Sequence, residues 1–252
     1  MLEDELSFAH EVADAAAEIA VPIFRGHPEV RLKPDNTPVT EADVRVEEMV
    51  RRAVAERFPS DAVLGEEGGK DREAERTWIV DPIDGTKNFA AGIQVWGSLL
   101  ALRIGERLVM GVVSAPVLGE RYDAVRGEGA TLNGQQIHVS ATGSIEEAAI
   151  CFGDPDNFFS GDLRGPFERL AARSSRTRGF GDFWGHMLVA RGSMDVMLEP
   201  ALNEWDYSAL VPIVEEAGGR ITQLDGSPLV HEGSALTTNR TLHDEVAAIF
   251  AG

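Results

Sequence analysis

Apolar residues recur every three or four positions over residues 6–24, a spacing that predicts an amphipathic helix. Residues 31–38 contain two prolines, an Asp and an Asn, and are expected to form a loop. Thr40 is a typical N-cap residue and Pro59 stops helices, so a second helix is expected from Thr40 to about Phe58. The start of the chain therefore predicts two helices joined by a loop.

Apolar runs and alternating segments predict strands in the middle of the chain. Residues 62–64 and 77–80 are short and mostly apolar, as buried strands are. Three longer segments between glycine-containing turns predict an antiparallel meander, at residues 95–104, 108–115 and 120–125. An Asn-Gly pair at residues 133–134 is a hairpin signal that leads into residues 136–140.

In the second half of the chain, strand patterns are separated by helical ones. The predicted strands are residues 148–152 and 194–199, and the predicted helices are residues 163–173, 183–190, 205–217 and 242–250. Helices and strands mixed in both halves favour an α/β fold with layered (α+β) packing. No stretch resembles a linker, so residues 1–252 are expected to form one unit, with approximate subdomains 1–140 and 141–252.

The chain carries 23 basic and 42 acidic residues, a formal net charge of −19. This excess of acid disfavours nucleic acid as a partner, because binding to its backbone needs Lys and Arg. The excess of acid also disfavours an anionic small molecule as a ligand, and bound divalent cations would resolve this by inverting the local field. The alternative is that the acidic residues serve solubility alone.

Three features bear on the compartment of the protein. No apolar run approaches the roughly 18 residues of a membrane helix, so no membrane association is expected. The first residues are acidic and lack the basic region of a secretory signal. Cys151 is the only cysteine, which excludes an intrachain disulfide and a cysteine-based zinc site. We therefore expect a cytoplasmic protein.

Two carboxylates follow the predicted strand at residues 77–80. Asp81 and Asp84 flank a Pro-Ile pair, and with the Ile83 carbonyl they form a compact set of oxygen ligands that suits Mg²⁺. Gly85 and Thr86 come next and are expected to begin a short helix, whose free N–H groups bind phosphate. The alternative is an ordinary turn, since Asp-Pro and Asp-Gly are both turn formers.

The string WIVDPIDGTKNF at residues 78–89 resembles the signature of the inositol monophosphatase superfamily. A second signature, WDYSA at residues 205–209, is followed by EEAGG at residues 215–219, and a third element, GEE, lies at residues 65–67. All three stand in the family's order and the resemblance covers nearly the whole chain. It implies the αβαβα sandwich of inositol monophosphatases and fructose-bisphosphatases.

The resemblance also implies a magnesium-dependent phosphatase with two to three Mg²⁺ ions per site. The implied metal ligands are the side chains of Glu66, Asp81, Asp84 and Asp206 and the carbonyl of Ile83. The implied catalytic residues are Glu66, Thr86 and Asp43, which orient the attacking water, and Gly85 and Thr86 are implied to bind phosphate.

Each of these roles has a structural alternative. Glu66 can be a solvated loop acid, and Asp206 can simply favour the start of a helix. Asp43 lies three residues after Thr40, the spacing of a capping box. Lys87 is either a surface residue or a contact to phosphate.

The substrate depends on other residues. Inositol phosphatases carry a small-residue stretch where this chain has Gly-Asp-Phe-Trp-Gly at residues 181–185, and this stretch with residues 33–43 resembles the histidinol-phosphate phosphatase group. Histidinol phosphate carries an ammonium and an imidazole, so its pocket is expected to offer carboxylates and aromatic faces. Asp182, Glu199 and Glu204 are the expected carboxylates. The alternatives are that Glu204 is solvated and that Trp184 belongs to the core.

The expected activity is therefore hydrolysis of histidinol phosphate by a metal-activated water. Inositol-1-monophosphatase and 3′(2′),5′-bisphosphate nucleotidase are the alternative activities, and a non-catalytic phosphate-binding relative is a more remote one. The resemblance also implies a homodimer. Residues 154–165, which are acidic, aromatic and rich in glycine, are expected to form either a lid or a dimer contact.

Overall fold

The structure is a computed structural model that describes residues 2–33, 38–159 and 162–252. Its helices are α1 (Glu3–Arg25), α2 (Glu41–Arg57), α3 (Thr86–Ala90), α4 (Asp156–Phe159), α5 (Arg164–Arg173), α6 (Asp182–Ala190), α7 (Glu204–Ser208), α8 (Leu210–Glu216) and α9 (His243–Phe250). Its strands are β1 (Val30–Leu32), β2 (Pro38–Thr40), β3 (Ala62–Gly65), β4 (Gly69–Lys70), β5 (Arg76–Asp84), β6 (Gly97–Ile104), β7 (Arg107–Ala115), β8 (Glu120–Val125), β9 (Gly129–Leu132), β10 (Gln135–Gln136), β11 (Ala149–Phe152), β12 (Arg176–Arg178), β13 (Val196–Asn203), β14 (Arg220–Thr222) and β15 (Glu232–Thr238).

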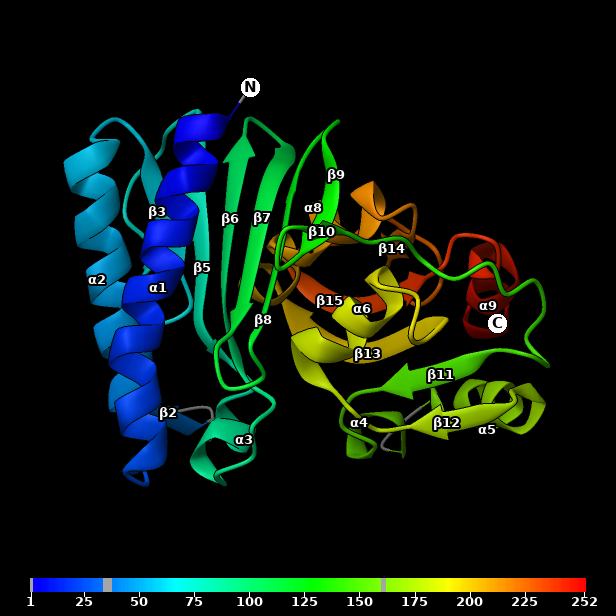
Figure 1. Cartoon of the computed structure of the whole chain (residues 1–252). Coiled ribbons are helices and arrows are strands. Elements are labelled where there is room, and N and C mark those ends of the chain that lie inside the picture. The colour runs from blue at the N-terminus through cyan, green and yellow to red at the C-terminus, as the bar shows by residue number, and fades with distance from the viewer. Residues whose placement is uncertain (1, 34–37, 160–161) are drawn as a thin grey trace.

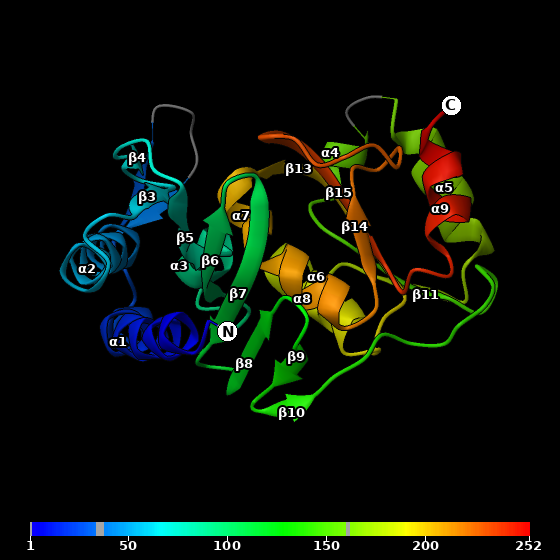
Figure 2. The ribbon, with the colours of Figure 1, turned by 90° about the horizontal axis from the view of Figure 1, so that it is seen from above.

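These elements stack in five alternating layers of helix and sheet (Figures 1 and 2). Helices α1 and α2 cover the outer face of the first large sheet, and α6 and α8 lie between the two large sheets. Helices α5 and α9 pack together on the outer face of the second large sheet. The predicted αβαβα sandwich is confirmed.

The first large sheet has the strand order β10-β9-β8-β7-β6-β5-β3-β4. Strands β5 to β8 are sequential antiparallel neighbours, which confirms the predicted meander, and β3 pairs with β5 in parallel. Strand β5 runs to Asp84, further than predicted, and its register with β6 shifts between Asp81 and Asp84. This irregularity places both carboxylates at the end of a buried strand.

The second large sheet has the order β12-β11-β13-β15-β14, with β11 parallel to β12 and β13. The chain passes from one sheet to the other between residues 136 and 149. The division into subdomains 1–140 and 141–252 stays a prediction, since sheet membership does not show separate folding.

Apolar side chains fill the space between the layers. Trp78, Phe89 and Trp96 are fully buried between the first sheet and helices α1 and α2. A second cluster joins the other face of that sheet to α6 and α8, and a third joins the second sheet to α5 and α9. The strand that carries Asp81 and Asp84 is therefore held by packing on both faces.

Two sequence predictions are wrong in detail. The predicted loop at residues 31–38 begins and ends in a small sheet, because β1 pairs with β2 with Val30 opposite Thr40. Residues 34–37 of that loop lie outside the described residues. The single helix predicted at residues 205–217 is two helices, α7 and α8, because Pro212 lacks an N–H and would clash with the carbonyl of Ser208 in a continuous helix.

Short elements were also missed. Strand β12 is only three residues long and carries two arginines, and α4 is a single turn inside residues 154–165. Residues 160–161 of that segment lie outside the described residues. No helix in the described part of the chain has the length and apolar character needed to cross a bilayer.

Candidate metal centre

Three carboxylates from two distant segments meet at the end of β5. Asp81 and Asp84 lie on β5 and Asp206 lies on α7, which packs against β5. One oxygen atom of each lies within 4.8 Å of the others. These are three of the predicted metal ligands.

Asp206 is positioned by the start of α7. Its Oδ2 accepts a hydrogen bond from the backbone N–H of Asn203 at 2.7 Å, as the N3 residue of a capping box. The cap uses Oδ2, so Asp206 can both start the helix and face the two aspartates of β5. Asp206 therefore does stabilise the start of a helix, as the structural alternative held, and this role is compatible with metal binding.

Asp84 and Ile83 are held by their neighbours. Asp84 Oδ2 accepts the N–H of Phe183 at 2.7 Å, which joins the end of β5 to α6. The Thr86 hydroxyl lies 2.9 Å from the Ile83 carbonyl and 3.2 Å from Asp43 Oδ1. A hydroxyl has one hydrogen, so Thr86 donates to one of these acceptors at a time.

Asp43 also has two contacts. Its Oδ2 accepts the N–H of Thr40 at 2.8 Å and the Thr40 hydroxyl at 2.6 Å, so the capping box at the start of α2 is real. Its Oδ1 faces Thr86. Burial raises the pKa of Asp43, whose side chain is 1% exposed. The capping role and the contact to Thr86 therefore coexist.

Glu66 lies in the turn between β3 and β4. It is outside the group formed by Asp81, Asp84 and Asp206. Its Oε1 is 2.7 Å from the ammonium of Lys33, which also lies 2.6 Å from Glu67 Oε1. Burial raises the pKa of Glu66 to about 7, although the hydrogen bond to Lys33 opposes the rise.

The three clustered carboxylates repel one another, and a bound cation would relieve this repulsion. Burial, and then repulsion between neighbouring carboxylates, raises the pKa of Asp81 and Asp84 well above the usual range. Burial raises the pKa of Asp206 to about 6. Asp81 Oδ1 is buried and has no hydrogen-bond partner among the described residues. A hard divalent cation fits here, because it would ligate that oxygen and offset the repulsion.

Two further predicted acids, Asp182 and Glu199, lie beside the cluster. Asp182 opens α6 with a φ of 49°, unusual for a residue other than glycine, and its Oδ2 accepts the Asn88 amide at 2.8 Å. Burial raises the pKa of Asp182 to about 6 and that of Glu199 well above its usual range. Glu199 is packed against Gly153, where any Cβ would overlap its carboxylate.

Glu204, Trp184 and Lys87 have partners within the chain. The Glu204 carboxylate pairs with Arg103 and lies 3.0 Å from His231 Nδ1. The Trp184 indole donates to Glu120 at 2.9 Å and packs against the core, in line with the structural alternative. Lys87 lies 3.3 Å from Asp154.

Sequence reasoning assigned no role to Lys33 and Asn88. Both lie within segments that carried the family resemblance. Their partners Glu66 and Asp182 are 33 and 94 residues away along the chain, so no local pattern could have identified these contacts.

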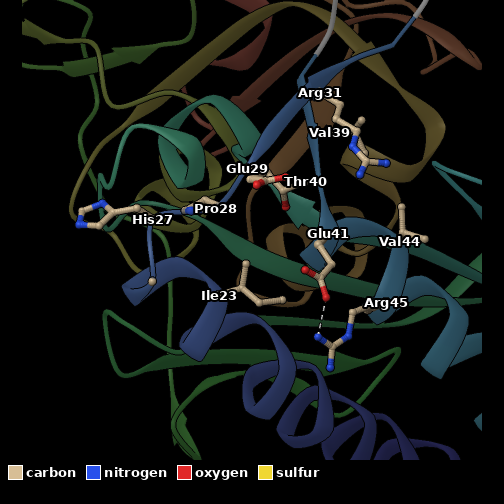
Figure 3. A pocket seen from close by; sticks show the side chains of 11 residues that line it. Ile23, His27, Pro28, Glu29, Arg31, Val39, Thr40, Glu41, Val44 and Arg45 are labelled. Atoms are coloured by element: carbon tan, nitrogen blue, oxygen red, sulfur yellow. Dashed lines mark hydrogen bonds and ion pairs between the residues drawn. The ribbon is translucent and has the colours of Figure 1, made fainter.

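A cavity of about 560 Å³ lies beside the start of α2, and none of the three clustered carboxylates lines it. Figure 3 shows its lining at the end of α1, along β1 and β2, and at the start of α2. The Glu41–Arg45 ion pair, at 2.8 Å, lies on its wall. Thr40 lines the cavity and is hydrogen-bonded to Asp43, which in turn faces Thr86.

Comparisons with known proteins agree with this geometry. The family model described as "Inositol monophosphatase family" matches residues 1–251. A histidinol-phosphatase of Mycobacterium tuberculosis is 44% identical, covering 98% of this chain and 97% of its own. A histidinol-phosphatase of Streptomyces coelicolor is 41% identical, covering 96% and 95%. The solved IMPase structure from Thermotoga maritima superposes with a TM-score of 0.90 at 30% identity, covering 98% and 97%.

The match to the family model and the identities to these relatives extend over nearly the whole chain. They confirm the resemblance that the three sequence motifs indicated. The family consists of metal-dependent phosphatases that act on small phosphate monoesters, and the carboxylate cluster fits that chemistry. This chain is a member of the inositol monophosphatase family.

Proposed function

We propose that this protein is a Mg²⁺-dependent phosphatase that converts histidinol phosphate to histidinol and phosphate. The observation that carries the choice of substrate is a pair of acids beside the metal centre, the half-buried Asp182 and the buried Glu199. Relatives named histidinol-phosphatase, at 41% and 44% identity over nearly the full chain, support the same substrate.

The proposed metal ligands are the carboxylates of Glu66, Asp81, Asp84 and Asp206 and the carbonyl of Ile83. Bound to this set, two to three Mg²⁺ ions would neutralise phosphoryl oxygens and make a water molecule more acidic. Oxygen-only ligands favour Mg²⁺ over softer metals. The orphaned Oδ1 of Asp81 supports at least one of these ions.

The protein residues position the reacting groups. We propose that Glu66 and Thr86 orient the attacking water, with the Thr86 hydroxyl aligned by Asp43. Gly85 has a φ of 81°, and a Cβ there would lie 3.0 Å from the Val95 carbonyl, so glycine is needed at this turn. The N–H groups of Gly85 and Thr86 are the proposed donors to phosphate.

Asp182 and Glu199 are the proposed contacts for the histidinol part of the substrate. The ammonium and imidazole of histidinol carry positive charge, and carboxylates at Asp182 and Glu199 would pair with it. Bound cations would also lower the raised pKa of both acids, which favours the ionised form that pairs with the substrate. Glu204 stays a proposed substrate residue, although it is already paired with Arg103 and lies 3.0 Å from His231 Nδ1.

We further propose that the protein is a cytoplasmic homodimer. Phe180 and Ile93 are large apolar side chains that are 37% and 50% exposed, which suits residues at a subunit contact. The single cysteine, Cys151, is buried and suits a reducing compartment.

A substrate panel tests the proposal. We expect kcat/KM for histidinol phosphate in saturating Mg²⁺ to exceed that for inositol 1-phosphate by at least about 100-fold, because a neutral polyol leaves Asp182 and Glu199 unpaired. A bisphosphate nucleotide should be poorer still, since it adds negative charge beside Asp182 and Glu199. A clear preference for inositol 1-phosphate would show that the substrate is wrong while the metal chemistry is right.

A further inference from the structure

Glu47 is a buried acid that has no place in the site described so far. It lies on α2, one turn after Asp43, and is only 3% exposed. A carboxylate is seldom buried unless it is paired and hydrogen-bonded. Its partners therefore indicate what it does.

The Glu47 carboxylate holds the turn that follows Glu66. Its Oε2 accepts the backbone N–H of Glu67 at 2.7 Å, and its Oε1 accepts the N–H of Gly68 at 2.8 Å. Two backbone donors to one carboxylate form charge-assisted hydrogen bonds, which are stronger and more directional than neutral ones.

Arg51 completes this arrangement from the next turn of α2. Its guanidinium lies 2.8 Å from Glu47 Oε1 and donates to the Gly69 carbonyl at 2.6 Å. The acid four residues before the base is the favoured order on a helix. Together the two side chains contact three consecutive residues, 67–69.

Two glycines allow this close approach. A Cβ at Gly65 would lie 2.5 Å from Glu47 Oε2, and a Cβ at Gly68 would lie 2.8 Å from Glu47 Oε1. Real side chains do not reach such distances, so the Gly-Glu-Glu-Gly sequence of this turn accommodates Glu47 and Arg51.

The consequence for Glu66 is a fixed backbone on both sides of its Cα. Its own N–H donates to the Val80 carbonyl at 3.3 Å, immediately before Asp81. The following N–H, of Glu67, donates to Glu47. The direction in which the Glu66 side chain leaves the backbone is thereby set relative to β5.

The same face of α2 also serves the other side of the centre. Asp43, Glu47 and Arg51 are spaced by four residues and so lie along one face of the helix. Asp43 contacts Thr86, while Glu47 and Arg51 hold the Glu66 turn. One rigid helix thus spans the two turns that carry the proposed water-orienting residues.

We propose that Glu47 is a positioning residue that, with Arg51, aims Glu66 at the metal centre and so sets the affinity for divalent cations. This rests on the proposed role of Glu66 as a metal ligand. Residues that orient metal ligands typically change metal affinity by about 10-fold to 100-fold when they are mutated.

The test separates position from charge. Glu47→Asp keeps the charge but is one methylene shorter and cannot reach both N–H groups. We expect the Mg²⁺ concentration for half-maximal activity to rise about 10-fold, while KM for substrate at saturating Mg²⁺ stays within about twofold. Glu48 is exposed on the same helix, so Glu48→Asp is the matched control and should behave as wild type.

Two readouts do not depend on turnover. Mn²⁺ binding, measured by electron paramagnetic resonance without substrate, should weaken by about the same factor in Glu47→Asp. Amide exchange at Glu67 and Gly68 should become faster, with no change at distant strands. If wild type binds Mn²⁺ but hydrolyses no phosphomonoester, the proposed function fails while this test still reports on Glu47.

Other outcomes overturn the proposal. Wild-type Mn²⁺ affinity in a folded Glu47→Asp protein would show that position is irrelevant. If Glu47→Gln weakens binding and Glu47→Asp does not, charge alone accounts for the effect. If Glu47→Asp fails to fold, Arg51→Lys is the second variant, since it keeps the charge pair but loses the fork that reaches Gly69. Unchanged Mn²⁺ affinity in Arg51→Lys would then contradict the proposal.

Discussion

At the scale of single residues, two of the proposed site acids also have a structural role. Asp43 and Asp206 occupy the same position, N3 of a capping box, and each caps its helix with Oδ2. From the sequence, a capping box was the alternative to a catalytic role for Asp43, and a favourable charge at a helix start was the alternative to metal binding for Asp206. The structure shows that the cap is the means by which the helix start holds each carboxylate towards the centre.

The substitution Asp84→Asn tests how repulsion among the clustered carboxylates affects activity and stability. The amide oxygen can still accept the N–H of Phe183, so the fold should persist. Activity should fall at least about 100-fold, because cations in such sites supply several kcal/mol of stabilisation. In metal-free protein, loss of a buried like charge should raise the melting temperature, by about 2–4 °C for each kcal/mol recovered.

Thermal unfolding with and without Mg²⁺ measures both effects. Wild type should gain more stability from Mg²⁺ than Asp84→Asn does, since the variant binds the ion less well. A metal-free Asp84→Asn protein that is less stable than wild type would contradict the repulsion inferred for this cluster.

At the scale of elements, local patterns predicted most of the fold. The two N-terminal helices, the meander and the Asn133-Gly134 hairpin, with positive φ at both turn residues, follow from periodicity and turn chemistry. The register shift in β5 and the break between α7 and α8 did not follow from local patterns. The register shift depends on the pairing of β5 with β6. The break depends on Pro212, whose effect on the helix was not recognised.

The junction of α7 and α8 packs closely against β7, so a larger residue on β7 should disturb it. Gly111 on β7 has no room for a side chain, because a Cβ would overlap the Ala209 carbonyl at that junction. Gly111→Ala should therefore destabilise the protein by about 1–3 kcal/mol and weaken metal binding through Asp206. Urea unfolding and Mn²⁺ binding measure these effects.

Gly143→Ala is the matched control. This glycine has open space at its Cβ position and no positive φ, so alanine should leave stability unchanged or slightly raised. Equal stability of the two variants would show that the close contact at Gly111 is not important.

At the scale of the whole molecule, the centre is assembled from segments that no local motif connects. Asn88 and Asp182 are 94 residues apart, and Arg103 and Glu204 are 101 residues apart. The motifs predicted which acids converge, as Asp81, Asp84 and Asp206 do. They did not predict that Asn88 holds Asp182 or that Arg103 holds Glu204, because these contacts arise only when the layers pack.

Acid sensitivity of the whole fold should come in part from buried His186. Burial lowers its pKa to about 3, while the unfolded value is about 6.5. Above pH 6.5 both states are neutral and stability is unaffected by this residue. As the pH falls below 6.5 the unfolded state binds a proton that the folded state does not, so stability falls.

Comparing the free energy of unfolding of wild type with that of His186→Gln isolates the effect of the imidazole. Between pH 7.5 and pH 5, wild type should lose about 2 kcal/mol more than His186→Gln, at the same Mg²⁺ concentration. Urea unfolding at the two pH values measures the loss. Identical losses would show that the imidazole is protonated in the folded state.

The central claim is that a carboxylate-bound divalent cation enables hydrolysis of histidinol phosphate. The most direct measurement is release of inorganic phosphate from histidinol phosphate by chelator-treated protein as Mg²⁺ is added back. The predicted result is no release without metal and full, saturable recovery with Mg²⁺. Release that persists in excess chelator, or no release at any Mg²⁺ concentration, would contradict the claim.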